Sequence, residues 1–243
     1  MGCPCELRLL ADSTEVAQQT AQACSSEALR FERKYSRYLD TSVTSSINRT
    51  AGLSATPIDS ETYGLLQYAG VCSEQSNGLF DITSGVLRQV WDKNRQTLPE
   101  QKELDQITRL IGWNKVLLTE NEVFLPERGM EIDFGGVVKE YAADAISVKI
   151  KAAGISSGLV SLGGDIVAFG STPGNAPWPV GIVHPTQRDA VIATIYLQDR
   201  ALATSGGYER YFEMQGKRYS HLINPHTGWP VDSLGIDQVT ITL

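Results

Sequence analysis

The chain has 243 residues, of which 42% are hydrophobic and 20% are charged, and its formal net charge is −7. This length and composition are typical of a globular protein with a sizeable core. The negative charge argues against a nucleic-acid or anionic-membrane surface, since either needs a basic patch. No apolar run reaches the roughly 18 to 20 residues of a spanning helix, and the start MGCPCELRLL lacks the regions of a signal peptide. As written, the sequence therefore predicts no membrane span and a cytoplasmic location.

The four cysteines predict neither disulfides nor a zinc site. Cys24 and Cys72 fall on the apolar sides of predicted helices, where we expect small buried hydrophobes. Cys3 and Cys5 are separated by one residue instead of the two usual in metal and redox pairs, and no histidine cluster accompanies them.

The first sixty residues predict a strand, a long helix and a loop. A strand is expected over 6–10, and Asp12 with Glu15 predicts a capping box for the helix that follows. A stripe at steps of three and four predicts an amphipathic helix; its members are Val16, Thr20, Cys24, Ala28, Phe31, Tyr35 and Tyr38. On this pattern Tyr38 is a tyrosine at the edge of the core. The Ser, Thr and Asn residues of 41–48 predict a loop.

Residues 59–125 predict helices followed by a hairpin. One helix starts at Asp59 or Ser60 and stops at Asn77-Gly78. Asp81, next to Phe80, is either the N-cap of a second helix or a ligand contact. The apolar side chains of that second helix are Val86, Leu87, Val90 and Trp91. Pro99 suits the first position of a third helix, closed by Gly112, and 116–119 with 122–125 predicts a hairpin.

The central stretch EIDFGGVVKEYAAD, residues 131–144, reads as a short extended run, a glycine pair and a helix. Such a corner directs backbone N–H groups and the positive end of a helix dipole at one point, which suits phosphate. Asp133 and Lys139 add a carboxylate and an ammonium. By itself the motif also fits a plain packing corner.

The C-terminal half predicts strands over 158–162, 178–183 and 190–197. Glycine pairs start at positions 135, 163 and 206, each directly after an apolar run. Three such pairs suggest a common cleft that a ligand can approach closely. Because strands and helices mix without regular βαβ alternation, the sequence predicts the α+β class.

Three histidines limit the choice of a general base. His184 and His226 lie in predicted turns and are expected to be solvated. His221 directly precedes the apolar pair Leu222-Ile223 on a predicted strand, where it is either a hydrogen-bonded core residue or a base. A neutral imidazole can take a hydroxyl proton near neutral pH.

Several motifs, in the same order, resemble the ApbE family of FAD:protein FMN transferases. They are MGCPCELRL at 1, YSRYLDTSVTSSINR at 35, GLFDITSGVL at 78, the D-x-G-G-x-x-K segment at 133, GLVSLGGDI at 158, ATSGGYERYF at 203 and YSHLINPHTGWPV at 219. The resemblance implies one domain over 1–243, built of two related T-fold-like lobes with a cofactor cleft between them. It also implies that FMN moves from FAD to a Thr or Ser hydroxyl of an acceptor protein, with release of AMP.

The resemblance implies functional roles for individual residues of this sequence. It implies His221 as the catalytic base and the carbonyl of Gly136 as a Mg²⁺ ligand. The residues expected to bind FAD are Met1, Tyr38, Leu79, Phe80, Asp81, Asp133, Lys139, Ser205, Gly206, His221 and Leu222. Magnesium suits oxygen ligands of this kind.

Two departures from the family pattern leave alternatives open. Asn224 stands where the family has Asp, and the sequence stops at Leu243 before a family segment whose Asp and Thr complete the metal site. We therefore expect this chain to bind FAD but to turn it over slowly or not at all. The alternatives are an FAD pyrophosphatase, a flavin-binding protein without turnover, and a structural domain without cofactor. The family is commonly periplasmic and lipid-anchored, so the compartment stays open.

Overall fold

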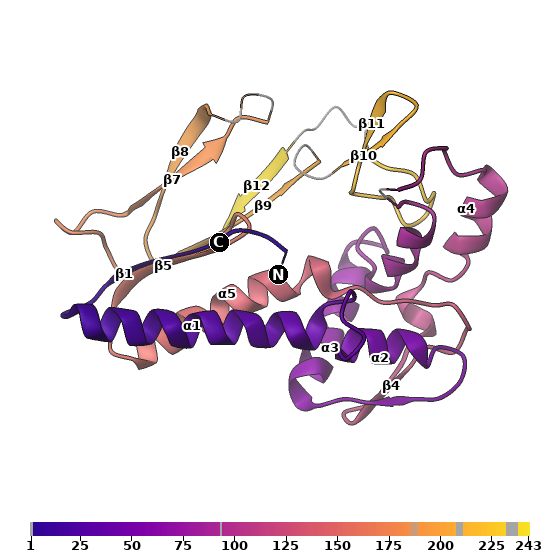
Figure 1. Ribbon diagram of the computed structural model, residues 1–243, viewed down its shortest axis with the longest axis horizontal. Coiled ribbons are helices and arrows are strands. Elements are labelled where there is room, and N and C mark those ends of the chain that lie inside the picture. Colours follow the sequence, from indigo (N-terminus) through magenta and orange to yellow (C-terminus); the bar gives the residue numbers. More distant parts are fainter. Residues whose placement is uncertain (1, 93, 186, 188, 208–210, 232–237) are drawn as a thin grey trace. The chain divides into compact units, whose positions relative to one another are not determined.

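The computed structural model describes residues 2–92, 94–185, 187, 189–207, 211–231 and 238–243. The chain divides into two compact units (Figure 1). Unit 1 comprises residues 1–32, 138–208 and 237–243, and unit 2 comprises 33–137 and 209–236. Each unit has its own buried core.

Unit 1 is built on a five-stranded antiparallel sheet in the order β1-β5-β6-β9-β12. Its strands are β1 (Cys5–Leu10), β5 (Ser157–Leu162), β6 (Asp165–Phe169), β9 (Arg200–Gly206) and β12 (Gln238–Thr242). A separate ribbon pairs β7 (Trp178–Val183) with β8 (Val191–Leu197). The helices are α1 (Thr14–Tyr35), whose last turn belongs to unit 2, and α5 (Val138–Ala152).

Strand β5 is buried at successive positions, which face opposite sides of the five-stranded sheet, so both faces are covered there. Helix α5 packs against β5 and β6, and the Phe31 ring of α1 meets the Tyr141 ring of α5 edge-on at 5.5 Å. Figure 1 shows the two helices side by side. A buried cluster joins the sheet to the β7–β8 ribbon; its members are Leu159, Ala168, Trp178, Val180, Ile182, Leu197 and Leu202. Unit 1 is thus a layered α+β body.

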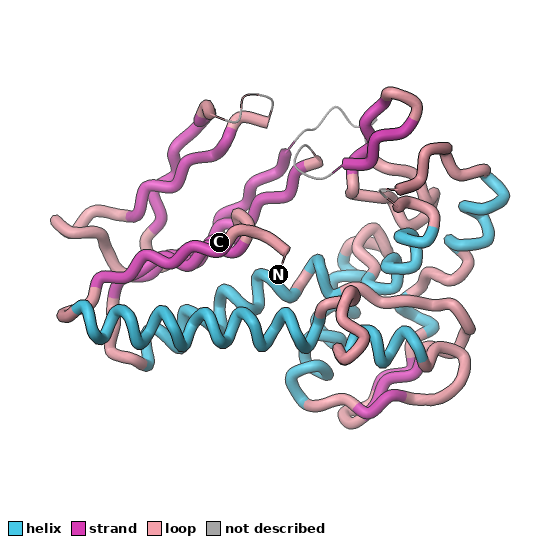
Figure 2. The backbone as a smooth tube through the Cα atoms, in the orientation of Figure 1, coloured by secondary structure: helices cyan, strands magenta, loops and turns pink. Residues whose placement is uncertain are grey.

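Unit 2 consists mainly of short helices, with small sheets at its margins (Figure 2). Its helices are α2 (Val43–Arg49), α3 (Ser60–Gln75), η1 (Ile82–Gln89), α4 (Gln101–Thr108), η2 (Trp113–Lys115) and η3 (Phe134–Gly136). Its strands are β2 (Thr56–Pro57), β3 (Leu117–Leu118), β4 (Glu122–Phe124), β10 (Tyr211–Met214) and β11 (Lys217–Ser220). The strands form the sheet β2-β4-β3 and the hairpin β10-β11.

Trp91 is the centre of one core cluster of unit 2. Its ring is fully buried and contacts the rings of Phe212, Tyr219 and Trp229 at centroid distances of 5.6 to 5.8 Å. The indole N–H donates to the Gly228 carbonyl at 2.7 Å, so the buried polar atom is satisfied. This contact ties the residues just after η1 to the 224–230 segment.

Several local predictions are confirmed. Helix α3 starts after Asp59, whose carboxylate accepts from the Thr62 N–H, and its last residue, Gln75, is followed by the C-cap Ser76 and by the predicted stop Asn77-Gly78, where both residues have positive φ. The β3–β4 hairpin and the β7 strand also form as predicted. Each rests on cap, turn or alternation chemistry within a few residues.

Other local predictions are wrong. Residues 41–48 are not a loop, because Ser42 caps α2 by accepting from the Ser45 N–H. The cap of α1 is not an Asp12–Glu15 box, since the hydroxyl of Ser13 accepts from the Val16 N–H. Pro99 precedes α4 by two residues, and the N-cap of that helix is Glu100.

The central stretch also differs from its prediction. Asp133 has extended φ and ψ, but residues 131–133 pair with no strand in the part of the chain that the structure describes, and η3 separates them from α5. The first glycine of the pair at 206, which we expected directly after an apolar run, is itself the last residue of β9. Sheet pairing decides this second case, because β9 lies between β6 and β12.

Cys24 is buried, as predicted, and Cys72 is half-buried. All four cysteines are free thiols. Within the described ranges, no helix has the length and apolar character to cross a membrane.

Candidate functional site

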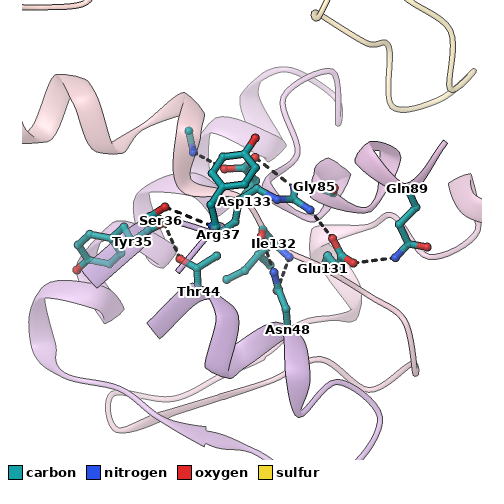
Figure 3. Close-up of polar contacts among 12 residues, drawn as sticks. Tyr35, Ser36, Arg37, Thr44, Asn48, Gly85, Gln89, Glu131, Ile132 and Asp133 are labelled. Carbon is teal, nitrogen blue, oxygen red and sulfur yellow. Dashed lines mark hydrogen bonds and ion pairs between the residues drawn. The ribbon is translucent and has the colours of Figure 1, made fainter. Parts of the chain in front are cut away.

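Arg37 joins three acceptors of unit 2 that come from distant parts of the sequence (Figure 3). Its Nη1 donates to the Gly85 carbonyl at 2.8 Å and to Asp133 Oδ2 at 3.3 Å, and its Nη2 donates to Glu131 Oε2 at 2.5 Å. The remaining oxygen of Glu131 accepts from Gln89 Nε2 at 2.7 Å. The planar fork of arginine suits such paired carboxylates.

Backbone contacts hold the segment that carries Asp133. Asn48 exchanges two hydrogen bonds with Ile132, through Oδ1 to the amide at 2.8 Å and through Nδ2 to the carbonyl at 3.0 Å. The Asp133 N–H donates to the Ile82 carbonyl at 3.0 Å. A Cβ on Gly85 would lie 2.9 Å from the carbonyl carbon of Ile132, so glycine permits this close approach of two backbones.

Asp133 caps the short helix η3. Its Oδ1 accepts from the Gly135 N–H at 2.9 Å, and its side chain keeps 27% of its surface exposed. Behind this turn, a Cβ on Gly136 would lie 2.9 Å from the Phe80 ring. Phe80, Asp133 and Gly136, three of the predicted site residues, thus converge within unit 2.

Asp81 is the N-cap of η1, which was one of its two predicted roles. Its carboxylate is buried and accepts from the Thr83 N–H, the Thr83 hydroxyl and the Trp113 N–H. Three donors leave this side chain little capacity for a ligand. A contact between Asp81 and FAD stays a prediction.

A pocket of about 740 Å³ opens beside Asp81, in unit 2. It is lined by the end of α3, by residues between α4 and β3, and by Pro225 and His226. His226 is exposed, as predicted, but its Nε2 lies 3.1 Å from the Asn77 carbonyl. This histidine therefore supports the α3 terminus.

Tyr38 and Leu79 are large apolar side chains left open to solvent. Their exposed fractions are 79% and 60%. Helix α1 ends at Tyr35, so Tyr38 lies beyond its packed stripe and is not a tyrosine at the edge of the core. Exposed side chains of this kind are available to a flat aromatic ligand.

At one end of the unit 1 sheet, Lys139 pairs with Asp165. The Lys139 ammonium contacts Asp165 Oδ2, while Asp165 Oδ1 accepts from the Thr204 N–H at 3.3 Å. Asp165 is only 3% exposed. The hairpin turn at Gly163 brings Cys3 beside this pair, since a Cβ on Gly163 would lie 2.9 Å from that of Cys3.

Glu140 adds a second carboxyl next to Asp165. Burial raises the pKa of Glu140, and the neighbouring Asp165 carboxylate raises it further, against the lowering effect of Lys139. Among the described residues, the buried Oε2 of Glu140 has no hydrogen-bond partner. Sequence reasoning missed both Glu140 and Arg37 as parts of these clusters; the adjacency of Arg37 to Tyr38, and of Glu140 to Lys139, was the available signal.

The other predicted site residues lie at strand ends. Ser205 and Gly206 are the last residues of β9, opposite Val239 and Gln238 of β12. His221 directly follows β11, so it is not within a strand, and Leu222 accepts from the Val231 N–H at 3.0 Å. Met1 lies outside the described residues. The functional roles of these residues stay predictions.

The carboxylate oxygens near Gly136 already accept hydrogen bonds from protein groups. Across the described ranges, no three His, Cys, Asp or Glu side chains gather as metal ligands. The predicted Mg²⁺ contact at Gly136 is a backbone carbonyl, and the nearby Asp133 oxygens accept from Gly135 and Arg37. These residues do not by themselves form a metal site.

Comparison with known proteins gives consistent matches. The model of the ApbE family matches residues 1–242. The chain is 28% identical to the FAD:protein FMN transferase of Klebsiella pneumoniae, over 99% of this chain and 74% of that protein. It is 32% identical to the enzyme of the same name from Treponema pallidum, over 83% of this chain and 60% of that protein. It thus spans between three fifths and three quarters of these two relatives.

A solved structure supports the same relationship. The ApbE protein of Thermotoga maritima superposes with a TM-score of 0.88 at 31% identity, over 97% of this chain and 77% of that one. This similarity confirms the predicted α+β fold.

Proposed function

Since the chain belongs to the ApbE family, we propose that it carries out FAD:protein FMN transfer, the activity for which its relatives are named. A Thr or Ser hydroxyl of an acceptor protein attacks the FMN-side phosphorus of FAD. The bond between that phosphorus and the bridging oxygen breaks, AMP leaves, and FMN stays on the protein as a phosphoester. The observation that carries the proposal is the match over residues 1–242.

The convergence of Phe80, Asp133 and Gly136 in unit 2 supports this proposal. In it, exposed Tyr38 and Leu79 provide apolar surface for the flavin. Lys139 offers an ammonium to the pyrophosphate, and His221 takes the proton of the attacking hydroxyl. Positioning and charge neutralisation are the main demands of phosphoryl transfer.

The proposal includes Mg²⁺ as a cofactor that would bind together with the phosphates of FAD. Mg²⁺ often binds through one or two protein ligands together with substrate phosphates and water. When bound, it would offset charge on the pyrophosphate. A titration of AMP release against Mg²⁺, with EDTA as control, tests this requirement.

The decisive experiment measures AMP release from FAD with and without an acceptor peptide that contains a Thr or Ser. We expect AMP to appear together with a peptide that is heavier by one FMN. AMP and free FMN without labelled peptide would instead indicate a pyrophosphatase. Absence of both FAD binding and AMP release would contradict the proposed function.

The base assignment predicts that His221→Ala lowers the transfer rate by about 10²-fold or more, the usual contribution of a general base. FAD affinity should stay within a few-fold, because the imidazole acts on the acceptor hydroxyl. His184→Ala and His226→Ala serve as controls and should lose much less activity. Equal losses from all three variants would reject His221 as the base.

A further inference from the structure

We propose that Arg37 is the positioning residue of the flavin site, because it fixes the orientation of the partly exposed Asp133 carboxylate. The link to flavin rests on the proposed function. The geometry itself rests on contacts within unit 2.

The guanidinium of Arg37 is held from three sides. Its side chain is only 13% exposed, and it contacts Gly85 of η1 as well as Glu131 and Asp133. These partners lie 48 to 96 residues away in sequence. A lysine at this place has no planar fork, so it cannot make the contacts to both carboxylates and to the Gly85 carbonyl at the same time.

Every oxygen of the two carboxylates has one donor. Arg37 donates a hydrogen bond to one oxygen of each carboxylate. Gln89 donates to the other oxygen of Glu131, and the Gly135 N–H donates to the other oxygen of Asp133. A carboxylate bonded through both oxygens cannot rotate freely. Asp133 nevertheless keeps 27% of its side chain exposed, so a ligand can reach it.

The backbone around Asp133 does not depend on Arg37. Asn48 fixes Ile132 through two hydrogen bonds, and the Asp133 N–H is bonded to the Ile82 carbonyl. The specific contribution of Arg37 is therefore the orientation of the Asp133 side chain and the charge balance of two neighbouring acids. Removing the guanidinium should disturb the carboxylate while the chain path persists.

The test compares Arg37→Met and Arg37→Lys with the parent by FAD titration and steady-state kinetics. We expect Arg37→Met to raise the Kd and the KM for FAD about tenfold, as for loss of a charge-assisted contact. At saturating FAD, kcat should stay within about threefold, since the reacting groups are intact. Arg37→Lys should recover part of the affinity.

A double-mutant cycle asks whether Arg37 acts through Asp133. In an Asp133→Asn background, Arg37→Met should change the Kd by less than about threefold. The matched control is Arg95→Met, which breaks another arginine–carboxylate pair of unit 2, with two contacts of 2.7 Å to Glu103. This control should lower the Tm but leave the FAD affinity unchanged.

Amide hydrogen exchange without FAD gives a readout that does not depend on the proposed function. Arg37→Met should speed exchange at Gly135, whose N–H donates to Asp133, while Ile132 stays protected by Asn48. Unchanged exchange at Gly135, or an equal loss of FAD affinity in the Asp133→Asn background, would overturn the proposal. If the parent binds no FAD, the proposed function fails, and the exchange data still decide the positioning role. Arg37→Lys takes the place of Arg37→Met if the latter does not fold.

Discussion

Each unit contains a cluster in which one cation lies beside two carboxyl groups. The two clusters differ in whether all the carboxyl oxygens accept a hydrogen bond. In unit 2, Arg37 contacts Glu131 and Asp133, and all four carboxylate oxygens have donors. In unit 1, Lys139 pairs with Asp165, while a buried oxygen of the adjacent Glu140 has no partner within the described ranges. The same charge balance thus gives one complete and one incomplete network.

The difference follows from the shapes of the two cations. A guanidinium presents five donors in a fixed plane, whereas an ammonium is a compact charge on a flexible stem. The arginine cluster can therefore hold two acids in place, while the lysine holds Asp165 and, among the described residues, Oε2 of Glu140 has no hydrogen-bond partner. Burial raises the pKa of Glu140 accordingly. In unit 2 the guanidinium contacts both carboxylates, whereas in unit 1 the ammonium contacts Asp165.

The largest effect is expected for Lys139→Met, because it leaves the buried Asp165 without its cation. The loss of unfolding free energy should be about 3 kcal/mol, the lower end for breaking a buried pair, since Lys139 is partly exposed. The double variant Lys139→Met with Asp165→Asn should recover most of this loss. Urea unfolding at pH 7 measures all three proteins.

Lys149→Met is the matched control on the same helix. Lys149 pairs with Glu27 at 3.1 Å but is 43% exposed, so its removal should cost about 1 kcal/mol or less. If Lys139→Met costs no more than this control, the Lys139–Asp165 pair is not the buried contact that distinguishes unit 1.

A smaller effect is expected for Gly85→Ala, which tests the arginine cluster without changing charge. The new Cβ would lie 2.9 to 3.1 Å from Ile132 and Asp133 atoms, two of them backbone atoms. The segment under Arg37 must shift, at a cost of about 2 kcal/mol in unfolding free energy. Gly64→Ala, in α3 with open space at its Cβ, should instead stabilise by about 0.5 to 1 kcal/mol. Equal effects of both changes would show that the arginine cluster tolerates displacement.

The smallest effect is expected for Glu140→Gln, and it depends on pH. The pKa of Glu140 is higher in the folded chain than its ordinary value of 4.5, so the fold prefers the protonated form. Ionisation of Glu140 therefore does not destabilise the parent below pH 4.5. The free energy of unfolding decreases as the pH rises from there through the folded pKa. Glutamine mimics the protonated form and can donate to Asp165.

Glu140→Gln should thus match the parent at pH 4 and exceed it by about 1 kcal/mol at pH 8, as for relief of one unsatisfied buried group. Thermal unfolding across this pH range measures the difference. Glu120→Gln, on the exposed turn between β3 and β4, should follow the parent at every pH. A constant offset for Glu140→Gln would contradict titration as its cause.

The sequence by itself determined the features that depend on near neighbours. The start of α3 at Asp59, its stop at Asn77-Gly78, the β3–β4 hairpin and the alternation of β7 follow from caps, turns and periodicity. The ordered motifs likewise sufficed to indicate the family that the match over residues 1–242 confirms. Each signal is written within a few consecutive residues or in their order.

The tertiary structure alone decided which polar groups meet. Arg37 contacts Glu131, 94 residues away in sequence, and Lys139 contacts Asp165, 26 residues away. The Asp81 carboxylate accepts hydrogen bonds from Thr83 and Trp113. Tertiary packing also placed Tyr38 in solvent. Hydrophobic periodicity encodes which face of an element is buried, but it does not encode which distant donor a carboxylate meets. That choice depends on the path of the whole folded backbone, because hydrogen bonds act only over about 3 Å.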